Sequence, residues 1–505
     1  MHKKDPLKYF AGVILFTMFL LNLIATPFWR ITHDTAFVHY IAMLIDKFNY
    51  VPYRDIYDTS MPATLILHIF LIGKPFGYTE SGLQLFNFLF TIMFLAVNII
   101  YLKRFSIFIR MIVGSYFLLI YQSYGLEMSL QRDFLACFFI LLSCILIRDL
   151  KKDCIKHILS GVSLGIAFCI KPQFGIGLPV IYFIGEKTID LAISKKRLTT
   201  LSIYILGFTI PIILSFMWLW KTGAWNDFWF MQKSYLPQYI QLDSNHEFIE
   251  SKLSSTLINI KNYLYKVPYW RLSFFVFVFG SLLCLKYDKM NKRFWAFNFI
   301  LGVLYSCTLM VSGQYFPYHF MSFFLFAFFP LAGFFLKSLP ERLKTLSSFA
   351  LTLIILNNVA QFPIETITWV KGDKPFITKG GRVDRLVSAI DKIRKEDETI
   401  QLFDWVEGGV AHALMNLNIT HRYRFITDHI FKHHLHLEAK KDLNTKYLNQ
   451  LKSGPPNLII KSLKHNYPKG RFTTKDLPQE YLNFIDKNYK IVFTDPDFLI
   501  YRLTI

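Results

Sequence analysis

The chain has 505 residues, of which 53% are hydrophobic and only 18% are charged, against roughly 25% charged in soluble domains. Its formal net charge of +21 would suit a nucleic-acid-binding protein, but the basic residues stand in short clusters between apolar runs, where membrane orientation signals are expected. This composition excludes an ordinary soluble domain and a nucleic-acid partner. It predicts a mainly α, polytopic membrane helical bundle.

The N-terminus carries Lys3, Lys4 and Lys8 before an apolar stretch at about 9–28. Trp29 and Arg30 follow it instead of a small-residue cleavage site, which predicts an uncleaved first span. The six cysteines show no CxxC or zinc spacing and lie in or beside apolar runs, so we expect buried, inert thiols: Cys137, Cys144, Cys154, Cys169, Cys284 and Cys307.

The short apolar segment 62–76 decides the topology. If it crosses the membrane, the basic loops that follow fall outside; if it is interfacial or re-entrant, they all fall inside, as the positive-inside rule prefers. We therefore place 62–76 in a long external loop, 29–81, and expect the tail from about 363 on the same side. Eleven spans are predicted, near 9–28, 82–101, 107–122, 131–148, 157–170, 174–185, 200–220, 268–286, 294–311, 319–336 and 346–362.

Two domains follow from the change of composition near residue 363. Residues 1–362 form the predicted transmembrane domain, and 363–505 a soluble α/β domain outside the cytoplasm. Short apolar runs at Ile400–Trp405, Asn457–Ile460 and Ile491–Phe493 predict strands, with Pro496 in a hairpin turn between 490–494 and 498–503.

Polar residues at the outer ends of the predicted spans are candidates for chemistry. Asp34 follows the first span, and Tyr53-Arg54-Asp55-Ile56-Tyr57-Asp58 lies further along the same loop. A carboxylate there can meet both a lipid-borne phosphate and a soluble acceptor. The alternative is that such acids are ordinary solvated loop residues, which is the interpretation we give Asp46.

Gln131-Arg132-Asp133 begins the fourth span. Charges so close to hydrocarbon are costly, so they pair or serve a site, although an adjacent Arg and Asp can also form a simple helix cap. Lys171, with Pro172 and Gln173, separates two short spans. Broken helices of this kind line cavities, and an anionic phosphate is a natural partner for the ammonium.

The turn Gly313-Gln314-Tyr315-Phe316-Pro317-Tyr318-His319 joins two late spans. Its Tyr and His donors suit a phosphate or sugar hydroxyls, and an interfacial aromatic belt explains the tyrosines equally well. In the tail, His429 and His433 have helical i, i+4 spacing, as in some zinc sites. No Glu lies between them as in HExxH, so the spacing fits either a metal site or ordinary histidines of a solvated helix.

Together these motifs resemble the GT-C superfamily of membrane glycosyltransferases, in particular the protein O-mannosyltransferases and the lipid A aminoarabinose transferase. The likeness covers about residues 1–340. It rests on Asp34 after the first span, the turn from Asp58 to Pro62, Asp133 at the fourth span, Lys171 to Pro179, and Tyr318-His319. His33 and Thr35 flank Asp34 where members often have Asp-Glu, and the Pro62 turn lacks the family's Lys.

The resemblance implies inverting transfer of a sugar from a polyprenyl-phosphate donor to a glycan, lipid or protein acceptor, with a divalent cation as a possible cofactor. It implies Asp34 as the base and Asp133 as a group that orients acceptor or sugar, with Arg54, Arg132, Lys171 and His319 as phosphate ligands. Asp55, Asp58 and Tyr318 complete the expected substrate site. It also implies a bacterial inner (plasma) membrane with an extracytoplasmic active site.

Two other interpretations remain open from the residues alone. A transporter or flippase of lipid-linked sugars would share the apolar bulk and the cavity charges. Transporters commonly show related halves, whereas here the polar groups collect on one side and no repeat is visible, which favours an enzyme. A receptor or scaffold that presents the tail is the third interpretation.

Overall fold

The computed structural model describes residues 6–56, 58–185, 195–239, 268–308, 316–372, 381–403, 409–422, 437–463 and 479–504, together with 254, 257, 258 and 260–262. The chain divides into two compact units. The first comprises 1–29, 87–215 and 249–375, and the second 30–86, 216–248 and 376–505. The predicted external loop and the tail therefore share one unit, while the domain boundary expected at residue 362 stays a prediction.

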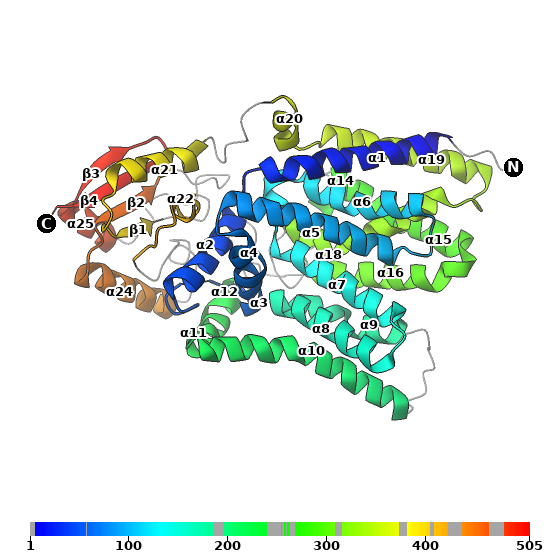
Figure 1. The fold of residues 1–505 in the computed structure, drawn as a ribbon, viewed down its shortest axis with the longest axis horizontal. Coiled ribbons are helices and arrows are strands. Elements are labelled where there is room, and N and C mark those ends of the chain that lie inside the picture. The colour runs from blue at the N-terminus through cyan, green and yellow to red at the C-terminus, as the bar shows by residue number, and fades with distance from the viewer. Residues whose placement is uncertain are drawn as a thin grey trace. The chain divides into compact units, whose positions relative to one another are not determined.

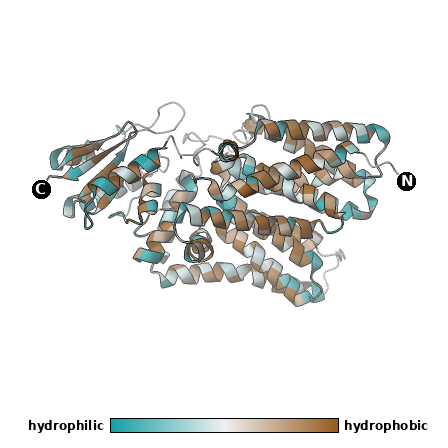
Figure 2. Ribbon diagram, turned by 45° about the horizontal axis from the view of Figure 1, so that its top comes forward, coloured by the Kyte–Doolittle hydropathy of each residue, from teal (hydrophilic) through white to brown (hydrophobic). Residues whose placement is uncertain are grey.

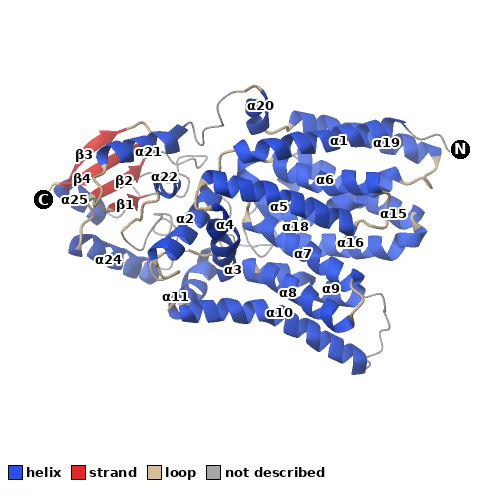
Figure 3. Cartoon of the chain, viewed as in Figure 1, coloured by secondary structure: helices blue, strands red, loops and turns tan. Residues whose placement is uncertain are grey.

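The first unit is helical in all the segments that the structure describes (Figures 1 and 3). Its elements are α1 (Pro6–Ala25), η1 (Thr26–Phe28), α5 (Glu80–Tyr101, whose first residues belong to the second unit), α6 (Ile107–Ser123), η3 (Gly125–Met128), α7 (Arg132–Asp149), α8 (Asp153–Ile170), η4 (Pro172–Gly177), α9 (Leu178–Gly185), α10 (Lys195–Lys221, which ends in the second unit), α14 (Pro268–Phe275), η6 (Val276–Gly280), α15 (Ser281–Tyr287), η7 (Lys289–Asn291), α16 (Lys292–Ser306), η8 (Pro317–Phe320), α18 (Met321–Phe328), η9 (Phe329–Phe335), α19 (Glu341–Ala360) and α20 (Ile364–Val370).

Within the described residues, each predicted span coincides with a helix or a run of helices, and residues 309–311 of the span expected at 294–311 lie outside them. Six helical segments of the described chain are long and apolar enough to cross a membrane: Pro6–Phe28, Glu80–Tyr101, Asp153–Ile170, Lys195–Lys221, Pro317–Phe335 and Glu341–Ala360. Hydrophobic residues dominate these helices (Figure 2). The chain is thus an integral, multi-pass membrane protein, while the count of eleven spans is not confirmed.

Small residues bring α8 and α10 together. Gly161 and Gly165 of α8 face the backbone of α10, where a Cβ added to them would collide with the carbonyl oxygens of Tyr204 and Phe208. Gly207 of α10 fits against Ile158 in the same way. Such a small-xxx-small pattern allows helices to pack through their backbones where lipid supplies no hydrophobic driving force.

The predicted break at Lys171 is present. Helix α8 ends at Ile170, Lys171 is extended with φ −148° and ψ 117°, and the 3₁₀ turn η4 begins at Pro172. Proline has no amide hydrogen to continue an α-helix and disfavours helical geometry in the residue before it. The sequence Lys-Pro therefore places Lys171 at the end of α8.

The second unit contains the helices of the predicted external loop: α2 (His33–Phe48), α3 (Pro62–Leu67), η2 (His68–Gly73) and α4 (Lys74–Phe76). It also contains α11 (Trp225–Phe230), η5 (Met231–Tyr235) and α12 (Leu236–Tyr239). Helix α2 has Asp34 in its first turn and Lys47 in its last, which is the favourable direction relative to the helix dipole. It is followed by the capping residue Asn49, whose φ of 57° is left-handed, a common helix stop.

The tail forms a four-stranded sheet in the order β1-β2-β4-β3 (Figure 3). Its strands are β1 (Ile400–Phe403), β2 (Leu458–Ser462), β3 (Tyr489–Thr494) and β4 (Phe498–Leu503), accompanied by α21 (Arg382–Ile393), α22 (Val410–Leu417), α24 (Leu437–Ser453) and α25 (Gln479–Asn488). β1 and β2 are parallel, with Leu402 beside Ile460, and the other pairs are antiparallel. Strands are present in all three predicted regions, of which residues 404–405 lie outside the described part of the chain, and the hairpin at Pro496 is confirmed. His429 and His433 lie outside the described residues.

Candidate functional site

Asp133 and Lys171 form a buried ion pair. Asp133 lies in the first turn of α7 and Lys171 at the break after α8, and the Lys171 Nζ donates to Asp133 Oδ2 at 2.5 Å. The side chains are 2% and 11% exposed. A buried charge is costly unless it is paired, so each of the two charges offsets the desolvation cost of the other. The structure thus joins two residues that we had selected separately.

Residues 316–319 of the late polar turn, whose residues 313–315 lie outside the described chain, contribute to the same cluster. Lys171 Nζ lies 5.9 Å from the ring centre of Tyr318, within the range of a cation–π contact. Tyr318 and His319 pack edge to face with ring centres 4.6 Å apart, and Phe316 stacks on Tyr318. Four predicted site residues, Asp133, Lys171, Tyr318 and His319, are therefore brought together, with Arg132 beside them as the first residue of α7.

The chemistry of this cluster suits a phosphate. A phosphate oxygen can replace the carboxylate as the acceptor of the Lys171 ammonium, since charge-assisted hydrogen bonds to either anion are strong. In a site with little water such a bond is stronger than at a surface. His319, which is buried, adds a ring nitrogen, and Tyr318 adds a hydroxyl group.

A hydrogen-bonded loop holds Asp133 in place. The Tyr121 hydroxyl donates to Asn87 Oδ1 at 2.7 Å and accepts from the amide of Leu130 at 2.9 Å. The Asn87 amide donates to Ser129 Oγ at 3.2 Å. Leu130 has φ 52°, a left-handed conformation that L-residues with bulky side chains rarely adopt. The network thus fixes a strained residue three positions before Asp133, and such strain often accompanies functional sites.

Glu365 supports the same loop from α20. Its carboxylate lies against Gly125, whose φ is 58° and where an added Cβ would lie 2.7 Å from Glu365 Oε2. Burial raises the pKa of Glu365, and hydrogen bonds at the backbone of Leu126 and of Glu365 itself oppose that rise. A side chain at position 125 would therefore displace the carboxylate and the loop together.

The other predicted site residues belong to the second unit. Asp34 is half-buried in the first turn of α2. Arg54 and Asp55 pair with each other, with Arg54 Nε and Asp55 Oδ1 2.8 Å apart, and Asp55 Oδ2 also accepts from the amide of Val51 at 2.7 Å. These contacts hold the turn at 51–55 together. Asp58 is buried a few residues later, and the substrate-binding roles of Arg54, Asp55 and Asp58 stay predictions.

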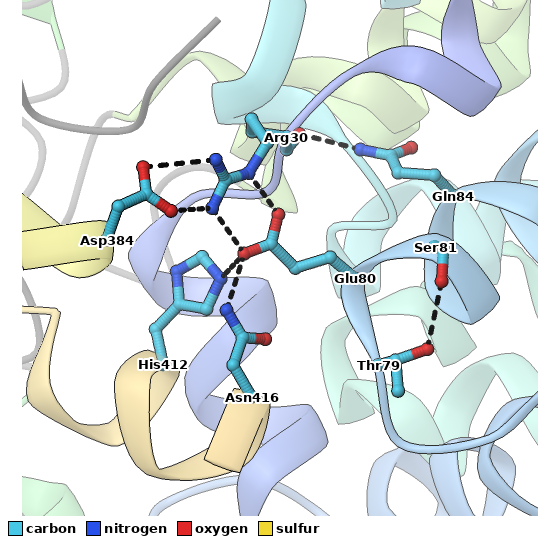
Figure 4. A network of polar contacts seen from close by, with 8 residues as sticks. All are labelled: Arg30, Thr79, Glu80, Ser81, Gln84, Asp384, His412 and Asn416. Carbon is cyan, nitrogen blue, oxygen red and sulfur yellow. Dashed lines mark hydrogen bonds and ion pairs between the residues drawn. The ribbon is translucent and has the colours of Figure 1, made fainter. Parts of the chain in front are cut away.

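A carboxylate that we had not selected, Glu80, is the centre of a polar network in this unit (Figure 4). Glu80 Oε1 accepts from Arg30 Nη2 at 2.9 Å, from His412 Nε2 at 2.5 Å and from Asn416 Nδ2 at 2.9 Å. Arg30 also bonds both oxygens of Asp384, at 2.9 and 3.2 Å. Burial alone would lower the pKa of Arg30, but the hydrogen bonds and charges of Glu80 and Asp384 outweigh it and raise that pKa.

Part of this network was visible in the sequence. Arg30 follows the first predicted span and Glu80 precedes the second, so the criterion that selected Asp133, a charge at the mouth of a span, applies to both. Asp384, His412 and Asn416 carry no such signal, because they lie on amphipathic helices of the tail. Among the described residues, no group of three or more His, Cys, Asp or Glu side chains is placed to hold a metal ion.

The long apolar helices define a polytopic membrane protein. It has a buried Lys–Asp pair at a helix break, a polar helical loop and a small mixed sheet. Its clusters of polar side chains lie at the ends of spans. The structure is similar to that of ArnT from Cupriavidus metallidurans in the apo state, with TM-score 0.61, 10% identity and 97% of each chain covered. The crystal structure of the same protein bound to undecaprenyl phosphate gives TM-score 0.59, at the same identity and coverage.

An oligosaccharyltransferase from Archaeoglobus fulgidus matches with TM-score 0.47 and 12% identity, over 90% of this chain and 69% of that one. No protein-family model matches the chain, and no curated protein sequence matches it. At this identity the comparisons show that the chain shares the fold of ArnT over nearly its whole length.

Proposed function

We propose that the protein is a glycosyltransferase that moves a sugar from a polyprenyl-phosphate donor to an acceptor. The observation that carries the proposal is the similarity of fold to ArnT, which extends over 97% of both chains and whose bound form holds undecaprenyl phosphate. The Asp133–Lys171–Tyr318 cluster supports it independently, because it provides a cation beside aromatic and imidazole groups at a break in the helical bundle.

In the proposed reaction Asp34 removes the proton from an acceptor hydroxyl. The acceptor oxygen attacks the anomeric carbon from the side opposite the leaving group, a C–O bond forms, and the bond from that carbon to the phosphate oxygen breaks. The polyprenyl phosphate leaves with the electron pair, and Lys171 stabilises the charge that develops on it. This geometry inverts the anomeric configuration.

The proposed reaction takes place at the extracytoplasmic face, in a bacterial inner membrane. The support is the distribution of basic residues, since placing the loops near 103–110, 148–156 and 286–293 in the cytoplasm places residues 29–81 and the tail outside. A glycan, a lipid or a protein can serve as the acceptor. A transporter or flippase of lipid-linked sugars, the alternative from sequence, would move the donor without consuming it.

The test is product formation by the purified protein with synthetic polyprenyl-phosphate sugars, followed by mass spectrometry, with NMR for the anomeric configuration. Asp34→Asn keeps the shape and removes the base, so turnover should fall by about 10²–10⁴-fold. Asp46→Asn on the same helix is the matched control, because Asp46 accepts from Tyr78 and pairs with Lys74, and it should stay within a few-fold of wild type. Normal turnover of folded Asp34→Asn would exclude Asp34 as the base.

A further inference from the structure

The C-terminal helices α21 and α22 contact the loop that contains Asp34 at two places. Near the start of the loop, Asp384 of α21 bonds Arg30, and His412 and Asn416 of α22 bond Glu80 (Figure 4). From the middle of α2 to just beyond its end, the residues that follow α22 accept hydrogen bonds from α2 and from Tyr50, the second residue after the helix. The segment between these two places contains the candidate base.

The first place fixes the backbone just before Asp34. The side chain of Arg30 is held between the carboxylates of Glu80 and Asp384, and its carbonyl oxygen accepts from Gln84 Nε2 at 2.7 Å. Both ends of the residue are therefore immobilised. Ile31 and Thr32 are buried, and Thr32 caps α2 through its carbonyl, which accepts from the amide of Ala36 at 3.0 Å.

The second place fixes the rest of α2. The Tyr40 hydroxyl donates to the carbonyl of Ile419 at 3.0 Å, and Lys47 Nζ donates to Asn418 Oδ1 at 3.0 Å. The Tyr50 hydroxyl bonds the carbonyl of His421. Because these acceptors form one short segment after α22, the orientation of α2 depends on the tail.

The contacts of His412 fit a purely positioning role. Its Nε2 faces Glu80 Oε1 and donates to it, whereas its Nδ1 is buried and has no hydrogen-bond partner within the described part of the chain. The ring therefore presents one nitrogen to Glu80 in a fixed direction.

We propose that the C-terminal region acts as a positioning element for the candidate base, through Arg30, Glu80, Asp384 and His412. This rests on the proposed function, in which Asp34 removes the acceptor proton. The physical reason is that a base must meet its proton within hydrogen-bond reach, and a displacement of about 1 Å can cost on the order of 10²-fold in rate. None of these four residues needs to touch the substrate.

The first experiment is a double-mutant cycle on single-turnover rates, with Glu80→Gln and the milder Asp384→Asn, whose side chain is 43% exposed. Either change should lower the rate, Glu80→Gln by about 10–100-fold, and leave the affinity for polyprenyl phosphate unchanged. In the Asp34→Asn background the same changes should lower the residual rate no further, because they act through Asp34. Asp391→Asn, an exposed acid on the same helix as Asp384, is the matched control.

The second experiment needs no turnover. Hydrogen exchange of the peptide 30–44 should be faster in Glu80→Gln and Asp384→Asn than in wild type and in Asp391→Asn, because the start of α2 loses an anchor. Unchanged hydrogen exchange in folded variants would overturn the positioning role. The role would also be overturned if Glu80→Gln or Asp384→Asn lowered the rate of the Asp34→Asn variant by the same factor as it lowers the rate of the wild type. A wild-type protein that makes no product, with exchange altered as expected, would instead count against the proposed function alone.

Discussion

Lys171 is the residue whose interpretation the structure changes most. From the sequence, a lysine without a substrate role would extend to water, and its replacement by Met would be harmless. The structure pairs it with Asp133, which is 2% exposed. Removing the ammonium alone leaves a buried, unpaired carboxylate, and breaking such a pair costs about 3–5 kcal/mol.

We therefore expect Lys171→Met to lower the melting temperature, and Asp133→Asn/Lys171→Met to recover most of that loss. Donor affinity should distinguish a purely structural role of Lys171 from a role in binding the carrier phosphate. If Lys171 binds the carrier phosphate, the double variant still binds undecaprenyl phosphate about 1.5–3 kcal/mol more weakly than wild type. Lys171→Arg should restore binding only in part, because a planar fork replaces a point charge. Wild-type affinity in the stable double variant would show that Lys171 does not contact the phosphate.

A second prediction at the residue scale concerns His39 of α2. Its Nε2 lies 3.3 Å from the carbonyl of Gly77, its Nδ1 lies 3.4 Å from His68 Nδ1, and the ring of Tyr78 packs beside it. Burial lowers the pKa of His39 to about 4, against the ordinary value of 6.5, and the hydrogen bond to Gly77 opposes this only in part. The folded protein therefore keeps this ring neutral where the unfolded chain protonates it.

The unfolded state binds the additional proton between pH 6.5 and about 4, so the stability that the neutral ring contributes is complete above pH 6.5 and is lost as the pH falls through that window. The loss should reach about 3 kcal/mol, since one pKa unit is worth about 1.4 kcal/mol. Melting temperatures in detergent from pH 7.5 to 4.5 measure it. His39→Gln should flatten the dependence, and an equally steep fall in that variant would assign the effect to other groups.

At the scale of elements, the hydroxyl of Tyr121 is one of the groups that hold the loop between α6 and α7. Tyr121 satisfies the amide of the left-handed residue Leu130 and also bonds Asn87. Tyr121→Phe keeps the ring and leaves that buried amide without an acceptor, which costs about 1–3 kcal/mol. We expect a lower melting temperature together with a lower turnover, because Asp133 follows directly. A variant with an unchanged melting temperature would mean that the loop is held by its other contacts.

The elements were predictable from sequence because their signals are local. Apolar runs located the helices of the bundle, Lys171-Pro172 located the break, and turn residues around Pro496 located the β3–β4 hairpin. The pairing of side chains was not predictable. Asp133 and Lys171 are 38 residues apart, and Glu80 and His412 are 332 apart, and no periodicity records which distant charges meet. The sequence identified Asp133 and Lys171 as candidate site residues, but it could not show that their charges neutralise each other.

At the scale of the whole molecule, the chain is a membrane protein whose tail shares a compact unit with the loop after the first span. From this grouping we expect the loop after the first span and the tail to lie on one side of the membrane. The charge distribution independently predicts the same, because it places the first loop and the tail opposite the basic loops. The two expectations come from different properties, contact and charge, so a single labelling experiment tests both.

In a variant without its native cysteines, single cysteines are introduced at exposed positions for labelling in intact cells with a membrane-impermeant maleimide. Thr79 and Glu396 report on the loop and the tail, and Lys151 and Met290, the latter 97% exposed, report on two basic loops. We expect labelling at 79 and 396 in intact cells, and at 151 and 290 only after permeabilisation. Labelling of 79 from the opposite side to 396 would mean that segment 62–76 crosses the membrane, and it would separate Asp34 from the tail that we propose positions it.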